Sequence, residues 1–229
     1  MTAPAPVPIV LATRNPGKVA ELAALLAPFK VTVLGLEYFP HIGEIKETGT
    51  NFRENTLLKA SAVSRETGLI AVADDSGLSV DVLGGAPGVY SAHYSETPEC
   101  PATDERNVQK LLAALTDVPQ AKRTGRFHCC MAACAPNGES ITAEGVWEGM
   151  IALAPAGKNG FGYDPIFFDP QTDKTAATMD PEEKNRRSHR AKAVAALLLK
   201  WPAFQQKTGS ASSVMRVTPS FFCSFSFLL

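Results

Sequence analysis

The order of hydrophobic and polar positions predicts a strand, a loop and a helix at the start of the chain. Residues 7–12 form an apolar run, and after a polar break apolar residues recur at helical spacing over residues 19–26. Asn15 stands where a helix N-cap is expected, and Pro16 follows at the first helical position, where its missing N–H costs nothing.

Further strands and a second helix are predicted before residue 80. Residues 31–34 are β-branched or apolar, which favours a strand. A helix is expected to begin near Asn51, because Glu54 follows three residues later as in a capping box. Residues 69–73 form a third apolar run, which leads directly into the polar segment 74–77.

The second half of the chain combines helices with a hairpin. Residues 104–115 have an amphipathic helical pattern, while 127–135 and 140–147 are predicted strands joined by a Pro-Asn-Gly turn. A glycine- and aromatic-rich loop over 160–168 enters another strand, and the last helix is expected to begin after Asp180. Strands that alternate with helices early and pair as a hairpin late predict an α/β fold with a mixed sheet.

Composition narrows the class of protein. The 229 residues are 45% hydrophobic and 20% charged, and 22 basic against 23 acidic residues leave a net charge of −1. This balance offers no basic surface for nucleic acid, and no apolar run approaches the roughly 18 residues of a membrane span. We therefore expect neither a nucleic-acid nor a membrane partner. Five cysteines without paired C-x-x-C spacing and a start that lacks a signal sequence predict a cytoplasmic protein.

The first candidate site lies between the first strand and the first helix, where free backbone N–H groups and the helix dipole favour an anion. It comprises Thr13, Arg14, Asn15, Pro16, Gly17 and Lys18. A Walker A loop is excluded, because Ala12 and Val19 occupy the positions that require Gly and Ser or Thr. A capped helix with a surface lysine remains the alternative.

The second candidate is the acidic segment Asp74-Asp75-Ser76-Gly77, expected directly after a buried strand. Adjacent aspartates on extended chain point to opposite sides, so one carboxylate can face a cleft and hold Mg²⁺. An acidic turn is the alternative interpretation.

Two later segments could recognise a base. The loop at 160–165 places two aromatic rings among glycines, which suits stacking on a base or simple packing. The last predicted helix opens with a run of basic residues, which either form a solvated face or contact a ligand: Lys184, Arg186, Arg187, His189, Arg190 and Lys192. His189 and Arg190 carry the hydrogen-bond donors that a carbonyl oxygen would need.

Taken together, five segments in order over roughly residues 8–203 give the chain a specific resemblance to a known family. They are LATRNPGKVAEL, ETGTNFRENTLLKA, ADDSGLSVDVLGGAPGVYSAHYS, FGYDPIFF and EEKNRRSHR. The chain resembles the inosine triphosphate pyrophosphatase family, which hydrolyses deaminated purine nucleoside triphosphates to the monophosphate and pyrophosphate. This implies an elongated mixed sheet flanked by helices, two lobes with the nucleotide between them, and a homodimer.

The resemblance also implies roles for single residues. The segment from Thr13 to Lys18 would cradle the triphosphate, Asp75 would accept a proton and bind Mg²⁺ together with Glu47, and Ser76 would contact the substrate. The purine end of the cleft would be formed by Phe161, Gly162, Tyr163, Asp164, Lys184, His189 and Arg190.

The sequence also bears on the domain boundary and on the alternative functions. The family pattern predicts a pyrophosphatase domain over 1–204, whereas the aromatic-rich segment 205–229 departs from it and is expected to lie outside the fold. The alternative functions are a related pyrophosphatase with another base preference and a non-catalytic nucleotide- or RNA-binding module. A pure polyanion binder gains nothing from carboxylates such as Asp75 and Glu47 in its cleft, which distinguishes the last of these.

Overall fold

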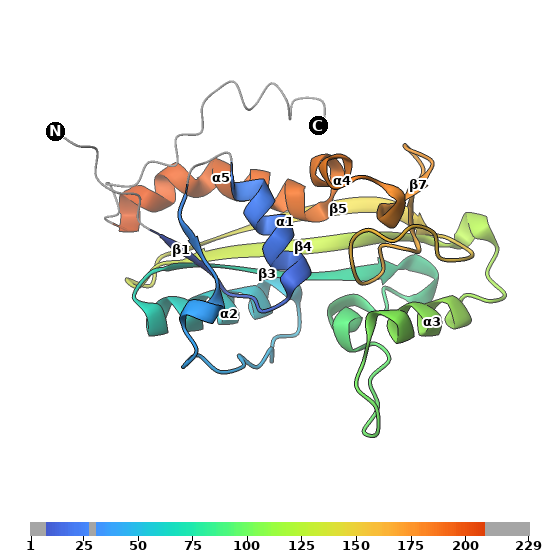
Figure 1. The fold of residues 1–229 in the computed structure, drawn as a ribbon, viewed down its shortest axis with the longest axis horizontal. Helices are drawn as coiled ribbons and strands as arrows, with labels where there is room; N and C mark the ends of the chain where they lie inside the picture. The colour runs from blue at the N-terminus through green and yellow to red at the C-terminus, as the bar shows by residue number, and fades with distance from the viewer. Residues whose placement is uncertain (1–7, 28–30, 209–229) are drawn as a thin grey trace.

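The computed structural model describes residues 8–27 and 31–208, and within these ranges seven strands form one mixed sheet in the order β2-β1-β3-β4-β5-β6-β7 (Figure 1). The strands are β1 (Ile9–Leu11), β2 (Val33–Leu34), β3 (Ile70–Val80), β4 (Thr124–Cys134), β5 (Ser140–Ile151), β6 (Phe167–Asp169) and β7 (Lys174–Thr175). β1 is parallel to β2 and β3, and every later pairing is antiparallel. The predicted mixed sheet is confirmed.

Helices cover both faces of the sheet. They are α1 (Pro16–Leu26), α2 (Phe52–Thr67), α3 (Asp104–Ala114), α4 (Pro181–Arg187) and α5 (His189–Thr208). In Figure 1, α1, α4 and α5 lie on one side of the long strands, while α2 and α3 lie on the other. Asn15 and Asn51 cap α1 and α2 as expected, each accepting a hydrogen bond from a backbone N–H of the first turn.

Three long strands, β3, β4 and β5, run through both lobes of the molecule (Figure 1). In one lobe they are packed between α1 and α5 on one face and α2 on the other. In the second lobe their far ends pack with α3 around Leu78, Phe127 and Trp147. β1 ends at Leu11, opposite Val72, so one edge of β3 is left without a β1 partner between the lobes.

The acidic segment is not at the end of a strand, and this expectation was wrong. Residues 74–77 lie in the middle of β3, because each of them pairs with β4, from Asp74 opposite Met131 to Gly77 opposite His128. The long-range ladder outweighs the local turn preference of Ser and Gly. The expected opposite orientation of the two aspartates follows from this extended backbone.

The last helix is also divided, against the prediction. Ser188 is extended at φ −62° and ψ 154°, and its Oγ accepts a hydrogen bond from Ala191 N at 3.1 Å. Ser188 therefore ends α4 and caps α5, so the basic run is shared by two helices. α5 continues to Thr208, past the expected domain boundary at 204, and residues 209–229 lie outside the described part of the chain.

In the described ranges, no helix is both long and apolar enough to cross a membrane. The long helix α5 instead packs along β5, where Lys192 and Lys200 donate from Nζ to the carbonyl oxygens of Val146 and Thr142 at 2.8 and 2.6 Å.

Gly145 of β5 sets how closely α5 can approach. A Cβ at this position would lie 2.1 Å from His189 O and 2.5 Å from Ala193 N, both of them backbone atoms of α5. The first turn of α5, with His189, therefore depends on the absence of a side chain here.

We expect Gly145→Ala to lower the free energy of unfolding by about 1–3 kcal/mol, because overpacking forces backbone to move. Urea unfolding of this variant and of Gly43→Ala tests it, since a Cβ at Gly43 meets nothing within 4 Å. Equal stability of the two variants would contradict the packing argument.

Candidate active site

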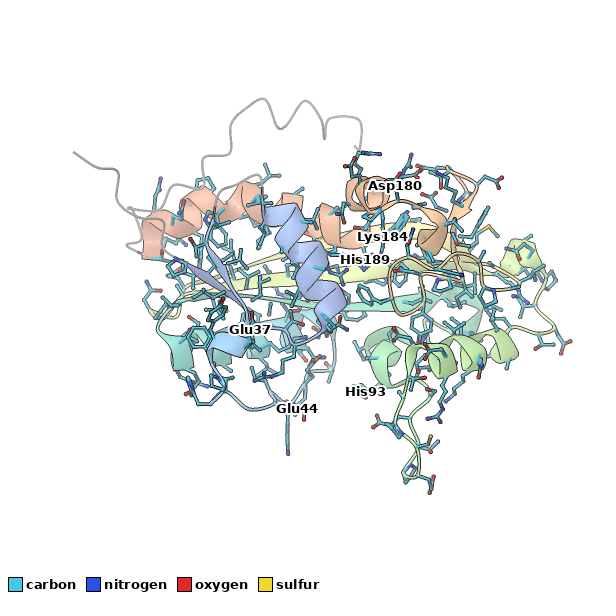
Figure 2. All side chains as sticks on the ribbon, in the orientation of Figure 1. Glu37, Glu44, His93, Asp180, Lys184 and His189 are labelled. Atoms are coloured by element: carbon cyan, nitrogen blue, oxygen red, sulfur yellow. The ribbon has the colours of Figure 1, made fainter. Side chains whose placement is uncertain are left out.

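A cavity of about 560 Å³ opens between the lobes, beyond the end of β1, and its size suits a small-molecule ligand. The predicted site residues that line it are Thr13, Arg14, Asn15, Lys18, Glu47, Asp75, Ser76, Phe161, Gly162, Tyr163, Asp164, Lys184, His189 and Arg190. Figure 2 shows Lys184 and His189 on the α1 side of the long strands and Glu44 and His93 on the other. The fold thus brings together segments that are far apart in sequence.

Asp74 is buried on the α1 side of the sheet and is paired with cations. Its Oδ2 lies 3.1 Å from Lys18 Nζ and 3.3 Å from Arg190 Nη2. Burial alone would raise the pKa of Asp74, but the charges of Lys18, Arg190 and Lys59 outweigh it and hold that pKa well below its usual range. Asp74 is therefore a structural carboxylate that neutralises buried positive charge.

Asp75 points to the opposite face, toward α2. Its Oδ2 accepts a hydrogen bond from Asn55 Nδ2 at 3.1 Å, and its Oδ1 lies 3.7 Å from Lys59 Nζ. The same ammonium group lies 3.1 Å from Glu47 Oε1. Burial, with a contribution from the charge of Glu47, raises the pKa of Asp75 despite the opposing effect of Lys59.

The two carboxylates Asp75 and Glu47 therefore share one cation at the wall of the cavity. Hard oxygen ligands of this kind are those that Mg²⁺ prefers, and the position of the Lys59 ammonium shows that positive charge is favourable here. This donor set fits a divalent cation.

The segment after β1 lines the cavity with Thr13, Arg14, Asn15 and Lys18. Asn15 Oδ1 accepts from Lys18 N at 3.1 Å, and Asn15 N donates to Thr13 Oγ1 at 3.2 Å. The Arg14 guanidinium donates to Ile42 O at 2.6 Å and so connects this segment to the following loop. Pro16, in the first turn of α1, does not line the cavity.

Phe161 forms an aromatic surface at the other end of the cavity. Its ring packs directly on Gly17, where an added Cβ would lie 2.5 Å from Phe161 Cδ1. The ring can take this position because Gly17 has no side chain. Lys184 Nζ and Arg190 Cζ lie 5.2 and 5.6 Å from the ring centroid, within cation–π distance.

Other residues of the loop that carries Phe161 have structural contacts. Asp164 Oδ2 accepts from Phe161 N at 2.9 Å and from Lys184 Nζ at 2.6 Å. The hydroxyl group of Tyr163, a buried residue, donates to Ser91 O at 2.9 Å. The loop lines the same cavity as Lys184, His189 and Arg190, and its role at the purine end of that cavity stays a prediction.

His189 is buried and stacked on Phe127, with ring centroids 4.7 Å apart. Its Nδ1 has no hydrogen-bond partner among the described residues. Burial, together with the charges of Arg190 and Lys184, lowers the pKa of His189 well below its ordinary value, so the imidazole is neutral at pH 7. A neutral imidazole offers one donor and one acceptor.

Arg190 is fully engaged by acidic partners. Its guanidinium pairs with Asp74 and with Glu21 of α1, and Nη2 lies 3.4 Å from Ser76 Oγ. Glu21 also pairs with Lys184, at 2.5 Å between Oε1 and Nζ. Ion pairs thus connect α1, β3, α4 and α5. The cations are Lys18, Lys184 and Arg190, and the carboxylates are Glu21, Asp74 and Asp164.

Comparison with known proteins identifies the group to which this arrangement belongs. The model of the Ham1 family matches residues 9–200. The chain belongs to the Ham1 family. A dITP/XTP pyrophosphatase of Nitratidesulfovibrio vulgaris is 60% identical over 199 residues, which cover 86% of this chain and 96% of that protein. A dITP/XTP pyrophosphatase of Escherichia coli O157:H7 is 50% identical and covers 83% and 95%.

Solved structures agree with the Ham1 assignment. A HAM1 protein from Coxiella burnetii has a TM-score of 0.76 and 42% identity, over 86% of this chain and 99% of that one. The Staphylococcus aureus Ham1 protein has a TM-score of 0.74 and 36% identity, over 86% and 98%. The resemblance and fold class predicted from the motifs are confirmed, and this Ham1 chain is an enzyme of that family.

Sequence reasoning missed three residues that contact the predicted site residues. Asn55 and Lys59 of α2 are buried beside Asp75, and Glu21 of α1 pairs with Arg190. A signal for the first two was present, since two polar residues four apart share the helix face of Ala60 and Val63. Polar residues on an apolar helix face indicate a buried partner.

The two aspartates should respond differently to loss of charge. We expect Asp74→Asn to lower the free energy of unfolding by about 3–5 kcal/mol, because Lys18 and Arg190 are left without their carboxylate. The fold disfavours the charged form of Asp75, so Asp75→Asn should leave stability unchanged or raise it. Urea unfolding at pH 7 measures both, and equal losses would refute the assignment of separate roles.

Proposed function

We propose that this Ham1 chain is a Mg²⁺-dependent nucleoside triphosphate pyrophosphatase that acts on inosine, deoxyinosine and xanthosine triphosphates. The observation that carries the proposal is the division of one cavity into an acidic end at Asp75 and Glu47 and an aromatic, cationic end at Phe161. The names of its relatives, dITP/XTP pyrophosphatases, agree with this chemistry.

Different residues would bind the phosphates, accept the proton of water and hold the metal ion. Lys18 and the N-terminus of α1 bind phosphate oxygens, since Lys18 can exchange Asp74 for a substrate anion at the surface of the cavity. Asp75, whose pKa is raised, accepts the proton of an attacking water. Asp75 and Glu47 would hold Mg²⁺, which would supply positive charge to the phosphate oxygens when bound.

The base would be read at the other end of the cavity. A purine that stacks on Phe161 gains affinity without discrimination, because every base has a π-face. The neutral ring of His189 can donate to a carbonyl at purine position 6, whereas the amino group of adenosine would present a second donor. Arg190 is occupied by Asp74 and Glu21, so we assign its function to holding this end in place.

The proposal includes a homodimer, as the family resemblance implies, and a cytoplasmic location. The rival functions are a related pyrophosphatase with another base preference and a non-catalytic nucleotide- or RNA-binding module. Two carboxylates at the cavity wall argue against the binding module, because they repel a polyanion in the absence of a metal.

Pyrophosphate release over a panel of triphosphates, with and without Mg²⁺, tests the reaction. We expect release from inosine and xanthosine triphosphates only with Mg²⁺, and a loss on the order of 10²-fold or more in Asp75→Asn. Asp81→Asn is the control, since Asp81 pairs with Arg126 outside the cavity. Wild-type rates in folded Asp75→Asn would refute the assignment of Asp75.

Base reading is tested by His189→Phe, which keeps a ring beside Phe127 and removes the N–H. Its kcat/KM should fall more for inosine triphosphate than for adenosine triphosphate, by up to about 10⁴-fold in their ratio. Phe161→Ala should slow both substrates to similar extents. An unchanged ratio in His189→Phe would place base reading elsewhere.

A further inference from the structure

Asn55 joins the two halves of the acidic end of the cavity. Its side chain is buried, and its Nδ2 donates to Asp75 Oδ2 at 3.1 Å. Its Oδ1 accepts a hydrogen bond from Gly49 N at 2.7 Å. One amide group thus contacts the carboxylate of β3 and the loop that carries Glu47, two residues before Gly49.

The loop lies directly against the start of α2. A Cβ at Gly49 would lie 2.6 Å from Asn55 Oδ1 and 2.9 Å from Asn55 N. Thr50 N donates to Glu54 Oε2 at 2.7 Å, and Glu54 N donates to Asn51 Oδ1 at 3.0 Å. These capping contacts hold Gly49 directly against Asn55. The position of Gly49 in turn limits the positions that Glu47, two residues earlier, can adopt.

Lys59, one turn further along α2, also holds Asp75 and Glu47, but by charge. A divalent cation that binds to the two carboxylates repels this ammonium group. The amide of Asn55 is neutral, and it contacts Asp75 through the oxygen that is not nearest to Lys59. Its two hydrogen bonds can therefore persist when a metal binds, whereas the ion pairs of Lys59 are weakened.

We propose that Asn55 is a positioning residue that holds Asp75 and Glu47 together for a divalent cation. The inference rests on the metal site of the proposed function. It requires both a donor and an acceptor on one side chain: the donor orients Asp75, and the acceptor fixes the loop at Gly49. Leucine has the same branched arrangement of side-chain heavy atoms as asparagine but neither group, so Asn55→Leu removes both contacts.

Mn²⁺ binding to the protein without nucleotide, followed by electron paramagnetic resonance, gives a readout separate from activity. We expect Asn55→Leu to raise the Kd for Mn²⁺ by about 10–100-fold, the range for a residue that orients metal ligands. Its pyrophosphate release should need more Mg²⁺ and recover at high Mg²⁺. The matched control is Thr56→Val, which removes hydrogen bonds of a buried neighbour to Phe52 O and Cys130 O and should leave the Kd unchanged.

Gly49→Ala gives a second test, in case Asn55→Leu does not fold. Its added methyl group displaces the loop from Asn55 Oδ1, and we expect Mn²⁺ binding to weaken several-fold while thermal unfolding stays cooperative. A wild-type Kd in folded Asn55→Leu, or in Gly49→Ala if only that variant folds, would overturn the inference. If Asn55→Leu weakens Mn²⁺ binding but the wild-type protein releases no pyrophosphate, the proposed function fails and the positioning role stands.

Discussion

Adjacent side chains on an extended strand must point to opposite faces of a sheet, and the site of this protein is arranged around that constraint at Asp74 and Asp75. Both carboxylates lie in the middle of β3, where pairing with β4 keeps the backbone extended. Asp74 is therefore directed into the ion pairs beneath α1 and α5, and Asp75 into the space beside α2. Because β1 is short, β3 has no β1 partner beyond Val72, and the cavity opens beyond the end of β1.

The charges on the α1 side are balanced. Lys18, Lys184 and Arg190 face the carboxylates that neutralise them: Asp74, Glu21 and Asp164. Such a network is costly to bury and gains its stability only when each charge has a partner. Lys18 is the most accessible of the three cations. Under the proposed function, the triphosphate and the buried carboxylate of Asp74 would compete for its ammonium group.

Local signals in the sequence were sufficient to predict most helices and strands. They were not sufficient to predict how far β3 extends or which side chains meet at the site. Caps at Asn15 and Asn51, the Asn-Gly hairpin and the apolar periods specified most helices and strands, because they act within a few residues. The continuation of β3 through residues 74–77 depends on hydrogen bonds to β4, more than 50 positions away in the chain. The partners of Asp75 on α2 are likewise long-range contacts. Their polar side chains on an apolar helix face indicate a buried partner but do not identify it as Asp75.

The two lysine contacts between α5 and β5 bear on assembly. Among the described residues, β5 pairs with β4 along one edge and with β6 only at Met150 and Ile151 on the other. An edge without a partner strand is the kind of surface on which a strand of another molecule can add. On this strand, the ammonium groups of Lys192 and Lys200 donate to the carbonyl oxygens of Val146 and Thr142. A strand of a second copy would have to displace both ammonium groups before it could extend the sheet at these two carbonyls, so the packing of α5 hinders growth of the sheet along this part of β5.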